Sequence, residues 1–178
     1  MTDQKSFDDV VAPASPPLTP PLHVEVIRSA KRKKTSQARL RGGVLEVRIP
    51  DWFSAKQETE TVSHFAERFE RSRASRQIDL AQRAHELATA FDLPVPQQIT
   101  WVTNQRDRWG SCTPAHGTIR LSDRLAQFPA WVVDYVIVHE LAHLIESNHS
   151  ERFWEIVNRY ELTERARGYL IAKGHDGL

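Results

Sequence analysis

The chain has 178 residues, of which 40% are hydrophobic and 26% charged, and its formal net charge is +1. This composition is typical of a globular protein with a packed core, and the nearly neutral charge indicates no particular class of partner. The single cysteine, Cys112, excludes an internal disulfide and suits a reducing compartment. No segment approaches the roughly 20 apolar residues that cross a bilayer, and the start MTDQKSFDDV lacks the apolar run of a secretory signal. We therefore expect a cytoplasmic protein without membrane contact.

The N-terminal part divides into a tail and the start of a folded domain. Residues 1–22 hold five of the ten prolines and show no apolar periodicity, so we expect a disordered Pro-rich tail there and a single domain over residues 23–178. Apolar residues alternate roughly over 23–29 and more clearly over 44–50, which predicts two strands. Gly42–Gly43 suits a turn or bulge before the second strand.

Helical spacing of apolar residues follows over 55–91. Ser54 and Gln57 have the spacing of a capping box at the start of this region. The basic stretch at 71–77 is either an exposed helical turn or a break between two helices. Pro94 ends the region, because proline and the residue before it resist helix.

The C-terminal half predicts two short strands followed by helices. The strands are expected at 98–103 and 118–122, with the loop PAHG between them. A helix that is apolar on most sides is expected over 130–147, and shorter helices over 151–160 and 162–172. Ser150 is a candidate N-cap for the first of these shorter helices. Because strands and helices occur in separate blocks, the fold class expected is α+β.

The stretch HELAHLIESNH, residues 139–149, carries the clearest chemical signal. His139 and His143 are four residues apart, so on a helix both imidazoles lie on one face and can converge on one metal ion. Glu140 is rotated about 100° from His139 and lies beside the metal, where a base can take a proton from a bound water. This spacing is the H-E-x-x-H pattern of zincin metallopeptidases.

A catalytic zinc site needs a third protein ligand and an open fourth position. His149 follows His143 by six residues, the interval found in metzincins, although Glu146 stands where those proteins have a glycine. We expect the helix to end near 147–148, with Asn148 in the left-handed conformation that reverses the chain. His149 is the favoured third ligand, and Glu146 and Glu155 remain alternatives.

Two other interpretations of the histidine cluster stay open. Without a metal, the helix would bury several polar groups that need partners. A structural zinc site would fill the fourth position, for which Cys112 is a candidate. The segment Trp109–Cys112 itself either lies beside the cleft or forms a turn followed by a buried small thiol, and the second interpretation is favoured for Cys112.

The segments RWGSC, GTIRLS, PAWVVDYVIVHELAHL and NHSERFW occur in this order. In them the chain resembles the YgjP-like bacterial metallopeptidases, relatives of the SprT-like group, over about residues 23–172. The resemblance implies a zincin-like fold in which a small sheet packs on an active-site helix, with further helices on both sides. It also implies one zinc ion per chain, with Glu140 as the base. The zinc ligands that it implies are His139, His143 and His149.

The expected function is hydrolysis of peptide bonds in a peptide or protein substrate. Zinc activates a water molecule, and Glu140 accepts its proton and passes it to the leaving amine. An extended substrate is expected to pair with an edge strand near 99–103 or 118–122. The candidates by residue type for stabilising the oxyanion are Tyr135, Asn148 and Tyr160.

The stretch Arg28–Arg41 has seven basic residues and no acidic one. It favours an exposed strand edge and hairpin that lysines protect from aggregation. The alternative is contact with nucleic-acid phosphates, which would make the protein a nucleic-acid-associated binding module with a structural or vestigial zinc site. We expect a monomer in either case.

Overall fold

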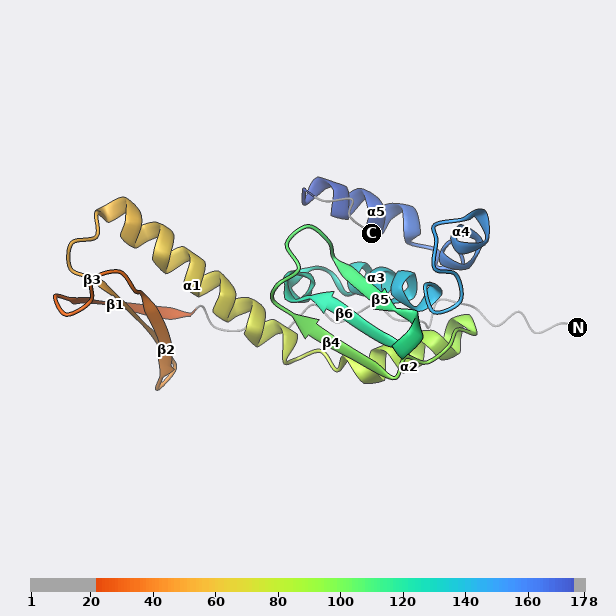
Figure 1. Cartoon of the computed structure of the whole chain (residues 1–178), viewed down its shortest axis with the longest axis horizontal. Helices are drawn as coiled ribbons and strands as arrows, with labels where there is room; N and C mark the ends of the chain where they lie inside the picture. The colour runs from red at the N-terminus through yellow and green to blue at the C-terminus, as the bar shows by residue number, and fades with distance from the viewer. Residues whose placement is uncertain (1–21, 175–178) are drawn as a thin grey trace, which may run out of the picture.

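The structure is a computed structural model that describes residues 22–174, so the tail expected over 1–22 lies outside the described residues except for Leu22. It contains two three-stranded sheets, and the helix α1 runs from one sheet to the other (Figure 1). No helix among residues 22–174 is both long and apolar enough to span a membrane. In chain order the elements are β1 (His23–Ser29), β2 (Gln37–Arg41), β3 (Val44–Pro50), α1 (Ala55–Ser75), α2 (Leu80–Phe91), β4 (Gln98–Val102), β5 (Gly110–Thr113), η2 (Pro114–His116), β6 (Thr118–Ser122), η3 (Asp123–Gln127), α3 (Ala130–Ala142), α4 (Glu151–Val157) and α5 (Thr163–Ala172).

In the first sheet β3 lies between the other two strands, parallel to β1 and antiparallel to β2. The inward-facing residues Leu45, Val47 and Ile49 are fully buried and form a core with one face of α1. The predicted turn between β2 and β3 is present, with positive φ angles at both glycines of Gly42–Gly43. Within the basic stretch, β2 is an edge strand, whereas Lys31–Lys34 lie in the loop between β1 and β2.

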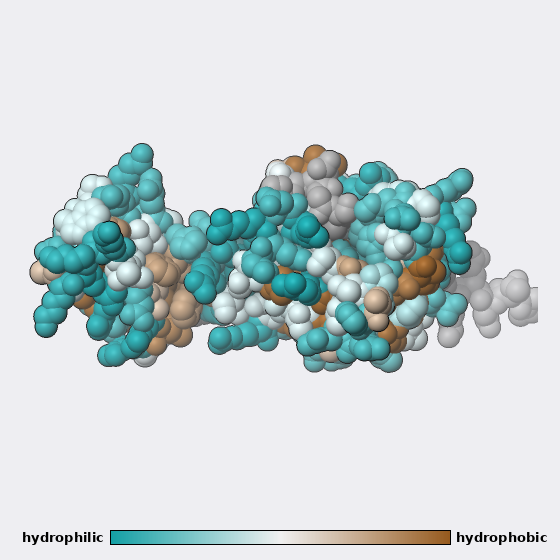
Figure 2. All heavy atoms as spheres, viewed as in Figure 1, coloured by the Kyte–Doolittle hydropathy of each residue, from teal (hydrophilic) through white to brown (hydrophobic). Residues whose placement is uncertain are grey.

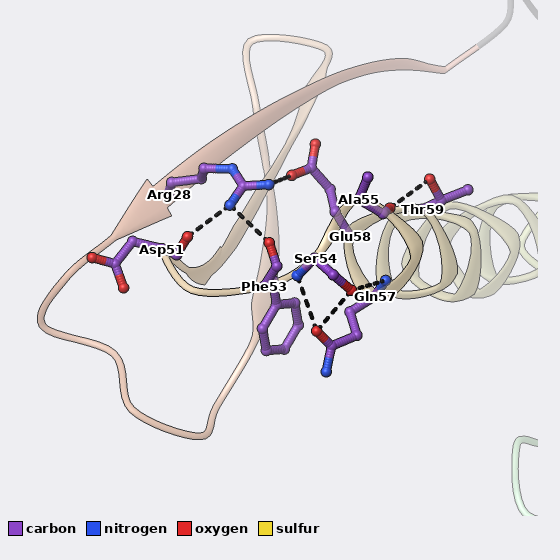
Figure 3. A network of polar contacts seen from close by, with 8 residues as sticks. All are labelled: Arg28, Asp51, Phe53, Ser54, Ala55, Gln57, Glu58 and Thr59. Carbon is purple, nitrogen blue, oxygen red and sulfur yellow. Dashed lines mark hydrogen bonds and ion pairs between the residues drawn. The ribbon is translucent and has the colours of Figure 1, made fainter.

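A network of polar contacts joins the start of α1 to this sheet (Figure 3). The predicted capping box is confirmed: the Ser54 side chain accepts from the backbone of Gln57, whose own side chain accepts from the Ser54 backbone. The Arg28 guanidinium donates to the carbonyls of Asp51 at 2.7 Å and Phe53 at 3.0 Å, and also pairs with a carboxylate of the first helical turn. These contacts fix the direction in which α1 leaves the sheet.

In the second sheet β6 is the central strand, parallel to β4 and antiparallel to β5. The strand β5 was not predicted, because GSCT is too short to show apolar alternation. It forms a hairpin with β6 through η2 and Gly117, which has φ of 57°. The expectation of a loop there was right, but its role as a hairpin connection was not recognised.

The helix α3 lies at the centre of the larger core, with every residue from Val132 to Ala142 buried. It contacts β5 of the second sheet as well as α2, α4 and α5. The side chain of Arg83 on α2 makes two 2.7 Å hydrogen bonds to the carboxylate of Asp134 on α3. The expected α+β class is therefore confirmed, as is a small sheet packed on the predicted helix with further helices around it.

Two predicted helix ends were wrong. The helix α3 ends at Ala142 rather than at 147, and α4 ends at Val157 rather than at 160. Asn148 was expected to adopt the left-handed conformation, but Asp92 is the only non-glycine residue with positive φ among residues 22–174. The chain instead turns through backbone hydrogen bonds between residues three apart in the sequence, such as the one from Ile145 N to Ala142 O at 3.0 Å.

Candidate metal centre

The structure brings His139, His143 and His149 together. One ring nitrogen from each lies within 4.8 Å of the others, and the Nε2 atoms of His139 and His149 are 3.1 Å apart. His139 lies in the last turn of α3 and is fully buried, while His143 is the residue that caps this helix. The Nδ1 atom of His143 lies 3.0 Å from the carbonyl oxygen of Glu146, which leaves its Nε2 free to face the cluster.

The third histidine is held by the segment that begins α4. Ser150 caps α4, as the sequence predicts, with its hydroxyl accepting from the amide of Phe153. The ring of Phe153 contacts all three imidazoles at centroid distances of 4.5 to 4.8 Å. Trp154 stacks on His149 at 5.7 Å. The ring orientations of the cluster are therefore set by apolar packing from α4.

The electrostatic environment keeps at least two of the imidazoles neutral. Burial, together with the smaller effects of the nearby His143 and His149, lowers the pKa of His139 to about 2. Burial also lowers the pKa of His143. A neutral imidazole has a free lone pair, which is the form that binds a metal.

Glu140 is buried next to the cluster, with 2% of its surface exposed. Burial raises the pKa of its carboxyl to about 8, and the positive charge of Arg108 opposes this shift. Its Oε2 atom is buried without a hydrogen-bond partner among the described residues. The carboxyl group packs against Gly110, where an added Cβ atom would lie 2.3 Å from Oε1. Sequence reasoning missed Gly110, because a glycine at the start of a short strand has no signal that links it to a distant glutamate.

The donor set fits a zinc ion. At a zinc–nitrogen distance of about 2.05 Å, two ligands in tetrahedral geometry stand roughly 3.3 Å apart. The 3.1 Å between the Nε2 atoms of His139 and His149 is close to this value. If neither of these two Nε2 atoms carries a proton, their lone pairs face each other and repel. A cation bound between the two rings would remove this repulsion. The carboxylates of Glu146 and Glu155 do not belong to the convergent group found among the described residues.

The three histidines open into a cavity of about 440 Å³ between α3 and β5. Ser122 N donates to Trp109 O at 2.8 Å, and Gly110 is paired in register with Leu121. Because hydrogen-bonded pairs alternate along an antiparallel ladder, Gly110 and Cys112 direct their backbone groups to the open edge of the sheet. The edge at the cavity is therefore β5. The expectation that 118–122 is an edge strand was wrong, since β6 is paired on both sides.

The three candidates for the oxyanion role do not line this cavity. Tyr135 is fully buried, and burial raises the pKa of its phenol to about 12. The hydroxyl of Tyr160 donates to the carbonyl of Trp131 at 2.9 Å. Asn148 is exposed beside the site. Cys112 does line the cavity and is half-buried, which favours the interpretation that its segment lies beside the cleft.

A larger cavity of about 930 Å³ lies between α1, α2, η3, α3 and α5. Its lining has no histidine or cysteine. Two of its charged side chains, Arg83 and Asp134, are already paired with each other. The one convergent group of candidate metal ligands among the described residues, the three histidines, lies outside it.

The site thus combines three convergent imidazoles with a buried carboxylate, which lies on a helix under an open sheet edge. This arrangement is typical of metallopeptidases. The model of the YgjP-like family, described as a metallopeptidase domain, matches residues 25–167. The chain belongs to this family, which confirms the resemblance seen in the sequence.

Comparison with solved structures finds two similar proteins. The metallopeptidase zymogen of Pyrococcus abyssi abylysin is 19% identical, with a TM-score of 0.49, over 55% of this chain and 97% of that one. The metallopeptidase zymogen of Methanocaldococcus jannaschii jannalysin is 20% identical, with a TM-score of 0.47, over 54% of this chain and 97% of that one. The search of curated proteins gave no match.

Proposed function

We propose that this protein is a zinc-dependent peptidase that holds one zinc ion through His139, His143 and His149 and uses Glu140 as its general base. The observation that carries the proposal is the convergence of three ring nitrogens within 4.8 Å beside a buried carboxylate. When bound, zinc would activate a water molecule and polarise the carbonyl of the scissile peptide bond.

The chain's own residues supply the remaining steps. Glu140 Oε2 has no partner among the described residues, so it is free to accept a proton and return it to the leaving amine. A cation at the histidines would favour the ionised carboxylate and oppose the effect of burial on its pKa. The free backbone groups of Gly110 and Cys112 would hold an extended substrate beside α3, as an added strand of the sheet.

Zinc content and hydrolysis test this proposal together. We expect about one zinc per chain in the wild type, large loss of zinc in His149→Ala, and no loss in His85→Ala, which removes an exposed histidine of α2. Glu140→Gln should keep the zinc but lose at least ~100-fold in hydrolysis of an unfolded protein. Zinc retained in His149→Ala would move the third ligand to Glu146 or Glu155. Full activity of Glu140→Gln would exclude the general-base role.

A second candidate function is binding of single-stranded nucleic acid by the first sheet. Trp52 is 55% exposed, and its indole N–H donates to the carbonyl of Lys33 at 3.2 Å, which sets an aromatic ring beside four consecutive basic residues. Hydrophilic residues predominate over this end of the molecule (Figure 2). Bases stack on exposed aromatic rings while basic side chains contact the phosphates.

Fluorescence anisotropy with a labelled oligonucleotide tests this second candidate. We expect salt-sensitive binding that falls about tenfold or more in Trp52→Ala and in the triple change of Lys31, Lys33 and Lys34 to glutamine. Lys56→Gln, which removes a basic residue from α1, should bind like the wild type. Equal binding by all of these variants would exclude this surface.

A further inference from the structure

Arg108 is the only lysine or arginine that lines the metal cavity among the described residues. Its side chain is exposed and makes no hydrogen bond or ion pair within residues 22–174. The side chain of Arg124, by contrast, lies 4.2 Å over the ring of Trp109 and donates to the carbonyl of Arg106 at 2.8 Å. Arg108 is therefore a cation at the cavity that the fold does not use.

The direction of Arg108 follows from the lining of the cavity. Arg108 lines the same cavity as Gly110 and Cys112, which as alternate residues of β5 share one side of the sheet. Gly110 contacts the Glu140 carboxyl, and the charge of Glu140 acts on Cys112, so this side faces α3. The charge of Arg108 also acts on Glu140, which agrees with this direction.

The neighbouring residues fix this position. Trp109 is fully buried and packs edge-on against Phe128 at 5.1 Å, so the backbone next to Arg108 is anchored. Asp107 also lines the cavity, but its charge acts on Arg124. The guanidinium of Arg108 thus stands at an anchored point of the rim, without a carboxylate bound to it.

We propose that Arg108 is a specificity residue that binds a carboxylate of the substrate peptide close to the scissile bond. The inference rests on the proposed peptidase function and names the substrate class of the same site. A peptide paired with Gly110 and Cys112 presents alternate side chains toward α3, on the side of Arg108. An arginine fork binds a carboxylate through two parallel charge-assisted hydrogen bonds. The carboxylate comes either from an acidic side chain or from the C-terminus of the peptide.

Matched peptides test the proposal. We would measure kcat/KM for peptides that differ only by Glu or Gln at each position around the cleaved bond, each with a free or an amidated C-terminus. We expect the wild type to prefer one carboxylate by about tenfold or more. A preference that follows Glu identifies the side chain, and one that follows the free C-terminus identifies the chain end.

Variants of Arg108 test whether this residue causes the preference for a carboxylate. Arg108→Gln should abolish it, with a loss for the acidic peptide that exceeds any loss for the uncharged peptide, and Arg108→Glu should reverse it toward a peptide with Lys at that position. Arg106→Gln is the matched control, since Arg106 is exposed two residues away but does not line the cavity. An unchanged preference in Arg108→Gln would overturn the proposal. An equal loss for charged and uncharged peptides would overturn it too, because Arg108 would then act on Glu140 instead of substrate.

A binding measurement separates this proposal from the peptidase function. In a Glu140→Gln background, which should not turn over substrate, fluorescence anisotropy gives the affinity for the labelled acidic peptide and its amide counterpart. Arg108→Gln should weaken only the acidic peptide, by about tenfold, and equal weakening of both would contradict a carboxylate site. If the wild type binds the acidic peptide through Arg108 but hydrolyses nothing, the peptidase proposal fails and the carboxylate site stands.

Discussion

Gly110 has a role that only the three-dimensional contact reveals. A Cβ atom at this position would lie 2.3 Å from Oε1 and 2.8 Å from the carboxyl carbon of Glu140, so the carboxyl would have to move. We predict that Gly110→Ala lowers kcat by about 100-fold, because a displacement of about 1 Å in a reacting group has this order of effect. Zinc content should stay unchanged, since the three atoms nearest to the added Cβ all belong to Glu140 and none to a histidine.

The control for this change is Gly168→Ala on α5, where an added Cβ meets no atom within 4 Å. This variant should keep full activity and gain slight stability from the better helix former. Wild-type turnover by Gly110→Ala would show that the Glu140 carboxyl can move without cost and is not positioned by β5.

Cys112 is predicted to be a slow nucleophile although it lines the cavity. Burial, together with the smaller effect of the negative charge of Glu140, raises the pKa of its thiol to about 12. Because the thiolate is the reactive form, alkylation by iodoacetamide at pH 8 should be much slower than in the unfolded chain and should rise with pH up to about 12. Glu140→Gln removes the neighbouring charge and should speed the reaction. Fast alkylation of the folded metal-free protein at pH 8 would contradict this prediction.

Some residues of the site could be predicted from the sequence and others could not, depending on how far apart they lie along the chain. The spacing of His139, Glu140 and His143 is local, so helical geometry alone predicts that they share a site. His149 needed only a chain reversal within six residues. Gly110 and Arg108 reach the site through strand pairing with β6 and packing on α3, and these long-range contacts leave no trace in one sequence.

The position of α3 depends on its ion pair with α2. Asp134 is 6% exposed, and both of its oxygens accept 2.7 Å hydrogen bonds from Arg83. We predict that Asp134→Ala lowers the free energy of unfolding by about 1–3 kcal/mol, because it leaves the partly buried Arg83 without its main partner. Urea denaturation measures this loss.

The matched control is Glu86→Gln, which removes the other carboxylate that Arg83 contacts. The Glu86 side chain is 45% exposed, so its removal should change stability by less than about 1 kcal/mol. Equal losses in the two variants would mean that burial does not distinguish the two ion pairs.

The helix α4 contacts the proposed metal centre through Phe153. Its fully buried ring contacts all three imidazoles, so it fixes their orientations without binding the metal. We predict that Phe153→Leu weakens zinc affinity by roughly 10–100-fold, the range found when groups that orient metal ligands are lost. Competition with a zinc chelator measures this change. Phe91→Leu, a change at the end of α2, should leave affinity unaltered, and equal affinity in both variants would exclude the positioning role.

Elements with local signals were predicted, and elements that depend on partners were not. The capping box of α1 and the serine cap of α4 are sequence patterns with a direct physical cause. The strand β5 is short and polar, and it exists because β6 provides hydrogen-bond partners, whereas β2 lies in the basic stretch where an exposed strand edge was expected. The end of α3 at Ala142 was missed because residues 143–147 have good helix formers, and the contact of His143 with the Glu146 carbonyl favours a turn instead.

The described part of the chain has two hydrophobic cores that share no residue. One is formed by the first sheet and one face of α1, and the other surrounds α3. Helix α1 connects them, and its 21 residues span about 32 Å. It has no fully buried residue, and its far end contacts η3, where Arg71 lies 3.7 Å from Asp123. The rings of Tyr135 and Phe153, which contact His139, belong to the second core.

This separation predicts that the first sheet can unfold while the metal centre stays intact. Leu45→Ala removes a fully buried side chain at a cost of roughly 2–5 kcal/mol, which is large for a three-stranded sheet. Native-state hydrogen exchange should then show faster exchange in β1 to β3 and unchanged exchange in α3, with zinc affinity unaltered. The reciprocal variant, Leu87→Ala on α2, should speed exchange in α2 and α3 and spare the first sheet. If Leu45→Ala speeds exchange equally in both regions, α1 couples the two cores into one cooperative unit, as expected for a single domain over residues 23–178.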